Sequence, residues 1–333
     1  MMNNQQRDLT IDLAKGIAIL FVYFGHSIIY HPIDLRDYYH WCFVLERMVT
    51  SFNMPMFFII SGLLFGFSHK SNRQVLTDKM RRLLIPYLFT MGVIMISKFF
   101  LPSEMAKHKL AGLGGVFLKD IFLHGGDRWF VYVLFWIFVL AIPFRNAIKT
   151  KCFWLIVSIS ITITIMDIMP EIFLSWKICK YITFFFIGMY CSQYYVQIKN
   201  TLSRYVWMLT LFFIVFNLCL IDRLNKMPFV WDVVLPLIGS SLFFGVAIKI
   251  GKRKDGTSKV WKALVGYIEY CGKFSLQFYL LTFAYPIIRF VTVKFVSDPV
   301  LIVLIVFILQ LIAVTILVEI TRRIKYLRIP LGY

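Results

Sequence analysis

The segment DLTIDLAKGIAILFVYFGHSIIY, residues 8–30, is mostly apolar but carries Asp12, Lys15 and His26. An apolar run of about 20 residues is long enough to cross the hydrocarbon core of a bilayer as a helix. Ionisable groups are costly there and usually face the interior of a helix bundle, where they serve a function. The segment therefore predicts a first membrane span that does more than anchor the chain.

The remaining sequence repeats this apolar pattern. Of its 333 residues, 59% are hydrophobic and 16% are charged, whereas about a quarter of the residues in a soluble domain are charged. The composition predicts an all-α, polytopic integral membrane protein that forms a single domain over residues 1–333, with no separate soluble domain. About ten transmembrane helices are expected, at residues 9–30, 43–65, 83–101, 129–144, 152–169, 178–195, 205–221, 232–250, 264–288 and 299–320.

The net charge of +19 is distributed unevenly between the predicted loops. With the N-terminus inside, the inner loops and termini hold 21 of the 36 Lys and Arg residues. Such an excess in short loops marks the cytoplasmic side of a membrane protein, so we expect both termini to be cytoplasmic. The basic charge is then an orientation signal, and it gives no reason to expect a nucleic-acid partner.

Two further patterns exclude other classes of site and segment. The six cysteines are scattered without C-x-x-C spacing, which argues against a disulfide or metal framework. The first apolar segment is interrupted by Asp12 and Lys15 and is followed by no small-residue cleavage site, so we do not expect it to be a signal peptide.

The longest outer loop, about residues 102–128, is long enough for a short interfacial helix.

Lys15 and His26 are eleven residues apart, which places them on nearly the same face of a helix, roughly 16 Å apart along its axis. Asp12 lies one turn before Lys15 and can pair with it. The imidazole of His26 titrates near neutral pH and could take a proton from a hydroxyl group. The alternative is that Lys15 and His26 only reach toward the two membrane interfaces.

Other polar residues lie near the predicted helix ends. Glu46 is at about the depth of His26 and could orient the imidazole, or it could simply pair with Arg36 or Arg47. Arg81 and Arg82 precede the third span at its cytoplasmic end. They could anchor that end or grip phosphate groups, for which the forked guanidinium is suited.

Further candidates carry less specific signals. Asn53 lies in the middle of the second span beside a proline, and Ser61 with Gly62 would permit close helix approach. Trp129 lies at the outer end of the fourth span, where a tryptophan is common simply because it anchors a helix at the membrane interface. Glu269 and Lys273 make the cytoplasmic half of the 264–288 segment polar, without indicating a role.

These motifs, taken in order, resemble membrane acyltransferase family 3, the O-acyltransferases of envelope glycans and other acceptors, and especially its fucose 4-O-acetylase-like branch. That family has a basic residue, ten intervening residues and a histidine in its first helix, matched by KGIAILFVYFGH from Lys15 to His26. The segment MPMFFIISG, residues 54–62, matches a second motif. Arg81 and Arg82 followed by a proline, and the WF pair at Trp129, match two more.

The resemblance implies a reaction that crosses the membrane. Acyl-CoA, most often acetyl-CoA, would dock from the cytoplasm as donor substrate with its phosphates near Arg81 and Arg82. Lys15, a catalytic and donor-binding candidate, could stabilise negative charge on the CoA or help shape the channel. His26 would act as general base on a saccharide hydroxyl, directly or through an acyl-enzyme, with Glu46 in support. Asp12, Asn53, Ser61 and Trp129 would contribute to the substrate site. No permanently bound cofactor or metal is expected, and the location would be a bacterial inner membrane, with lipid as a partner and an oligomer left open.

The sequence departs from the family pattern at two positions. Asn53 and Thr282 stand where many relatives have histidine. Neither change touches His26, so we expect activity to be kept and the choice of acceptor to differ. The main alternative function is a secondary transporter or exporter that uses His26 as a proton relay, although the chain lacks the internal repeats typical of transporters. A non-catalytic scaffold in polysaccharide assembly would leave the polar face of the first helix unexplained.

Overall fold

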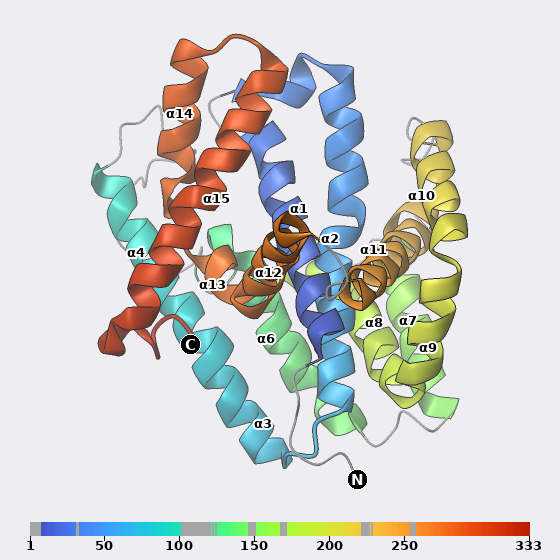
Figure 1. The fold of residues 1–333 in the computed structure, drawn as a ribbon. Helices are drawn as coiled ribbons and strands as arrows, with labels where there is room; N and C mark the ends of the chain where they lie inside the picture. The colour runs from blue at the N-terminus through green and yellow to red at the C-terminus, as the bar shows by residue number, and fades with distance from the viewer. Residues whose placement is uncertain are drawn as a thin grey trace.

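The computed structural model describes residues 8–30, 33–100, 125–145, 151–166, 172–220, 229–253 and 258–333, together with residues 121, 123 and 227. This part of the chain is almost entirely helical (Figure 1). The principal helices are α1 (Leu9–Ile28), α2 (His40–Gly66), α3 (Asn72–Lys79), α4 (Ile85–Phe100), α6 (Trp129–Ala141), α7 (Lys151–Met166), α8 (Ser175–Cys191), α9 (Tyr195–Arg204), α10 (Val206–Leu220), α11 (Leu235–Lys252), α12 (Lys259–Lys273), α13 (Ser275–Leu280), α14 (Tyr285–Phe295) and α15 (Pro299–Arg323).

Short elements connect these helices. A two-stranded antiparallel hairpin of β1 (Ile29–Tyr30) and β2 (Ile33–Asp34), which the sequence did not predict, follows α1 and leads into the 3-10 turn η1 (Leu35–Asp37). The π-helical turn η2 (Met80–Leu84) joins α3 to α4 within one membrane-length helical segment, Asn72–Ser97, and η8 (Val230–Val234) begins another, Val230–Lys252, which contains α11. The remaining 3-10 turns are η3 (Gly126–Arg128), η5 (Ile172–Leu174), η6 (Ser192–Tyr194), η9 (Thr282–Ala284) and η10 (Lys325–Leu327).

The predicted all-α, polytopic membrane class is confirmed. Within the described residues, six helical segments are long and apolar enough to cross a membrane, or up to seven if a bent pair counts as one span. That pair covers the predicted 178–195 and 205–221 segments and bends by 71°. The predicted 129–144 and 152–169 segments form α6 and α7, of 13 and 16 residues, and these are shorter than the length needed to span a bilayer upright.

The predicted 264–288 helix is wrong as a single element. The segment divides into α12, which ends at Lys273, and the α13–η9–α14 stretch that begins at Ser275. Pro286 explains the second interruption, at η9, because it has no backbone N–H to donate and its ring clashes with the carbonyl four residues earlier. Hydrophobicity averaged over a window does not register such breaks.

Helix α1 is at the centre of the bundle, in contact with α2, α11, α12, α13 and α15 (Figure 1). Protein buries 72% of the most apolar 18-residue stretch of α1, but only 28% of the corresponding stretch of α15. A span that exposes most of an apolar surface is suited to face lipid. α1 is therefore an internal helix, and α15 has a large face available to the bilayer.

Glycines allow two pairs of helices to touch through their backbones. A Cβ atom on Gly16 would lie 2.0 Å from the carbonyl oxygen of Ile268, and one on Gly272 would lie 1.7 Å from that of Asp12, so α1 and α12 are in contact at two points. Gly62 of α2 has the same relation to Phe185 of α8, at 1.9 Å. This confirms the close approach predicted at Gly62, and such small-residue crossings are common between membrane helices.

Candidate active site

The polar face of α1 begins with an ion pair. Lys15 Nζ is 2.9 Å from the Asp12 carboxylate, and the Asp12 side chain is buried whereas that of Lys15 is partly accessible. The predicted pairing of these residues is therefore confirmed. The N-terminus of the helix is fixed by Asp8, which accepts from Thr10 N and from Tyr195 Oη of α9, at 2.8 and 2.7 Å.

His26 is the one exposed residue of α1, whose other nineteen residues are buried or half-buried. Protein nevertheless surrounds the imidazole closely, and the Arg128 guanidinium acts on it electrostatically. The ring of Tyr285 meets it edge-on with centroids 5.9 Å apart. His26 thus combines dense surrounding protein with an accessible surface, a combination suited to a side chain that meets a substrate.

Arg128 is a residue that sequence reasoning missed. It ends η3, is 7% exposed, and its Nη2 donates to the Leu280 carbonyl at 3.1 Å. The guanidinium carbon lies 5.7 Å from the ring centres of both Tyr279 and Phe283, and Nε has no hydrogen-bond partner in the described chain. The available signal was an Arg directly before the WF pair, and it reads equally well as an interfacial residue.

Glu46 is directed toward a surface ion-pair group. Its carboxylate lies 3.4 Å from Nη1 of Arg36, which also binds Asp34 with Nη2 at 2.6 Å. Burial alone would raise the pKa of Asp34, but its hydrogen bonds from Arg36 prevail and hold this pKa below the ordinary value of 3.8. In the described chain Glu46 has contacts with Arg36 and not with His26, which is the alternative that the sequence left open.

The other substrate-site candidates do not gather around His26. Asn53 is buried in α2, with its side-chain oxygen accepting from Met54 N at 2.6 Å. Ser61 is half-buried beside the Gly62 crossing. Trp129 stacks on Tyr181 with ring centroids 5.5 Å apart, and Lys177 Nζ is 4.1 Å from the centre of the indole.

Arg81 and Arg82 are exposed on the π-helical turn η2. Arg82 and Lys79 both act electrostatically on Asp78, which forms an ion pair with Lys70. The turn follows α3, which lies at the same end of the bundle as the start of α1 (Figure 1). The end of α1, with His26, lies toward the opposite end, so the two predicted substrate sites are at different depths.

Residues 101–120, which include most of the predicted outer loop, lie outside the described residues, as do residues 254–257 of the basic loop before α12. Within the described chain, no group of three or more His, Cys, Asp or Glu side chains is arranged to hold a metal ion.

Comparison with known proteins supports the sequence motifs. A family model described as "Acyltransferase domain" matches residues 8–319. The nodulation protein NolL of Mesorhizobium japonicum is 27% identical over 206 residues, and that of Sinorhizobium fredii is 29% identical over 208 residues. Each alignment covers 60% of this chain and 52% of the relative, so the chain matches about half the length of these curated relatives. No solved structure matches. Because this family model covers nearly the whole chain, the multi-pass membrane protein belongs to the acyltransferase 3 family.

Proposed function

We propose that the protein is an O-acyltransferase that moves an acyl group, in the first instance acetyl, from cytoplasmic acyl-CoA to a hydroxyl group of a cell-envelope saccharide. The observation that carries this proposal is the accessibility of His26 alone on the central helix α1. A general base must be within hydrogen-bond reach of the proton it removes, which requires an accessible imidazole.

In the proposed reaction, His26 takes the proton of the acceptor hydroxyl as its oxygen attacks the thioester carbonyl carbon. The carbon–sulfur bond then breaks, and the CoA thiolate takes up the proton that His26 had removed, so the products are the ester, free CoA and neutral His26. Negative charge develops on the carbonyl oxygen during the attack, and a preorganised donor near that oxygen lowers the barrier. Arg128 is suited to this role because its buried guanidinium is near His26 and its Nε lacks a partner in the described chain.

The donor would enter from the end that carries η2. The exposed guanidinium groups of Arg81 and Arg82 would bind the CoA phosphates through charge-assisted hydrogen bonds, and the π-helical turn that presents them is a feature often found at functional sites. Lys15, one third of the way along the α1 face, would bind the donor between the phosphates and His26, with Asp12 holding the ammonium group in place.

The acceptor would enter from the opposite end. There Glu46 and Asp34 hold Arg36, which fixes the turn η1 beside the end of α1. Trp129, beside Tyr181 and Lys177, would border the acceptor passage, and Asn53 and Ser61 of α2 would line the bundle interior behind it. Membership of the fucose 4-O-acetylase-like branch and a location in a bacterial inner membrane are part of this proposal, and the relatives from Mesorhizobium japonicum and Sinorhizobium fredii agree with a bacterial source.

The decisive experiment compares His26→Ala with His40→Ala, which removes an exposed histidine from the start of α2. Mass spectrometry of surface glycans should detect acyl esters with the wild type and with His40→Ala, and none with His26→Ala at equal expression. Wild-type esterification by His26→Ala would refute the assignment of the base. Export of an unmodified glycan that depends on His26 would instead favour the transporter function.

A further inference from the structure

Gln310 is an unusual residue for its position in α15. Its side-chain nitrogen and oxygen are both buried and both lack a hydrogen-bond partner in the described chain, and the residue is 3% exposed. The other polar residues of this helix are bonded: Thr315 to Tyr267, Glu319 to Tyr270, and Thr321 to Tyr333. A buried amide without partners is unfavourable, so its presence in an apolar helix calls for a ligand.

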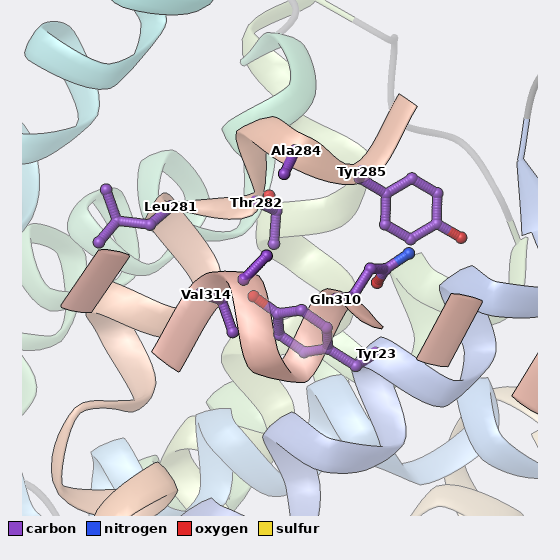
Figure 2. Close-up of a pocket in the computed structure, with 8 residues that line it drawn as sticks. Tyr23, Leu281, Thr282, Ala284, Tyr285, Gln310 and Val314 are labelled. Carbon is purple, nitrogen blue, oxygen red and sulfur yellow. The ribbon is translucent and has the colours of Figure 1, made fainter. Parts of the chain in front are cut away.

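The amide faces a narrow pocket between α1, the α13–α14 connection and α15. The pocket is lined by Tyr23, Leu281, Thr282, Ala284, Tyr285, Gln310, Ala313 and Val314. In Figure 2 the Gln310 amide lies between the rings of Tyr285 and Tyr23. The lining is otherwise mostly apolar, and its closed part has room for roughly one water-sized group.

The pocket adjoins the proposed general base. Tyr285 belongs to its lining and also meets the His26 ring edge-on. Tyr23, also in the lining, precedes His26 on α1 by about one helical turn, and is therefore on the side from which the donor would arrive. Its hydroxyl is already committed, donating to the Phe278 carbonyl at 2.7 Å. Compared with the Tyr23 hydroxyl, the Gln310 amide thus has the greater hydrogen-bonding capacity left for a ligand.

We propose that this pocket binds the acyl group of the donor, a deepening that rests on the proposed acyltransferase function. The Gln310 Nε2 group donates to the carbonyl oxygen of the thioester, and the apolar end formed by Ala313, Val314 and Leu281 receives the methyl group. The closed part of the pocket has room for the methyl group alone, so the carbonyl group lies at its open side, and each added methylene must displace protein atoms. The pocket therefore selects short acyl groups, acetyl above propionyl.

The first test enlarges the pocket. Val314→Ala removes two methyl groups from the lining, and the matched control Val318→Ala makes the same change one turn further along α15, at a buried residue outside the pocket. CoA release is measured with acetyl-CoA and propionyl-CoA, using the purified full chain in nanodiscs and the envelope glycan fraction of the source cells. One methylene is typically worth about 10–200-fold in such pockets, so Val314→Ala should lower the acetyl preference about tenfold or more, and Val318→Ala should leave it unchanged.

The second test removes the amide. Gln310→Leu should reduce kcat with acetyl-CoA by roughly 100–1,000-fold and leave the KM for the donor unchanged, because the CoA phosphates dominate its binding. Its melting temperature should equal or exceed that of the wild type, since an unpaired polar group is replaced by an apolar one of similar size. Thr315→Val, which removes a bonded hydroxyl from the same helix, should keep the acyl preference.

The two levels of the proposal fail separately. If the wild type releases CoA from neither donor in the presence of glycan, the acyltransferase proposal itself is refuted. If the wild type is active but Val314→Ala and Gln310→Leu leave both the acyl preference and kcat unchanged, only the acyl pocket is refuted. A Gln310→Leu variant that raises the KM for glycan alone would refute it as well, by assigning the amide to the acceptor.

Discussion

Replacing Gly272 with alanine should force α12 away from α1, the helix that carries Lys15 and His26. A Cβ atom at this position would lie 1.7 Å from the Asp12 carbonyl oxygen and 2.9 Å from Gly16 N. Both of these atoms belong to the backbone, which cannot turn aside as a flexible side chain would. α12 and α1 must therefore move apart, and α1 carries Lys15 and His26.

The size of this effect follows from the contact. Real Cβ atoms essentially never lie closer than 3.0 Å to another heavy atom, so the helices must separate by about 1 Å, and such overpacking typically costs roughly 1–3 kcal/mol of stability. A misplacement of about 1 Å in a catalytic group can reduce the rate about 100-fold. The variant should thus be less stable than the wild type and lose most of its acyl transfer.

Gly266→Ala is the matched control, because it makes the same change on the same helix where nothing lies within 4 Å of the new atom. Alanine in an open helical position is favourable by up to about 1 kcal/mol, so this variant should be as stable as the wild type or slightly more so. Melting temperature and CoA release from acetyl-CoA are measured for all three proteins in nanodiscs. Equal stability and activity of the two variants would refute the role of the α1–α12 contact.

Two further predictions concern the ends of the bundle. Arg82→Ala should raise the KM for acetyl-CoA about tenfold, the value of one charge-assisted hydrogen bond, whereas Arg323→Ala, at an exposed position of α15, should not; an unchanged KM for Arg82→Ala would remove Arg82 from the donor site. The pKa of Asp34 in the folded protein is below its ordinary value of 3.8 because of its hydrogen bonds with Arg36. These bonds therefore stabilise the turn η1 fully above pH 3.8, and the stabilisation is lost as the pH falls through the pKa of folded Asp34. Hydrogen exchange of residues 33–39, corrected for intrinsic rates, should therefore be constant from pH 5 to 8 in the wild type and faster throughout in Asp34→Asn; equal rates in the two proteins would contradict this.

The sequence was sufficient where the relevant contacts lie within one helix. The spacing of Asp12 and Lys15 predicts their ion pair because residues three apart are neighbours on a helical surface, and the pair is present at 2.9 Å. The small residue Gly62 in an apolar run predicts a close crossing for the same kind of local reason. The sequence could not say that Phe185 would be the partner, since that depends on how α2 and α8 pack.

The sequence failed where long-range packing decides. Arg128 is separated from Leu280, whose carbonyl it binds, by 152 positions along the chain. Gln310 is an unremarkable polar residue in an apolar run until the fold deprives it of partners. The division of the 264–288 segment and the 71° bend between α9 and α10 are also invisible to an average of hydrophobicity, because a helix that stops and restarts has the same composition as a continuous one.

Buried polar atoms without partners become informative here through their location. Such atoms also occur in Asn217 and Trp261, each in a different part of the chain from the candidate site. Those of Arg128 and Gln310 instead both adjoin the Tyr279–Tyr285 segment, since Arg128 contacts Leu280 and Phe283 while Gln310 shares its pocket with Leu281 and Tyr285. The same Tyr285 contacts His26. Natural proteins break the rule of satisfied polar groups mainly where function requires it, so two such donors near one accessible histidine support a substrate site there rather than imperfect packing.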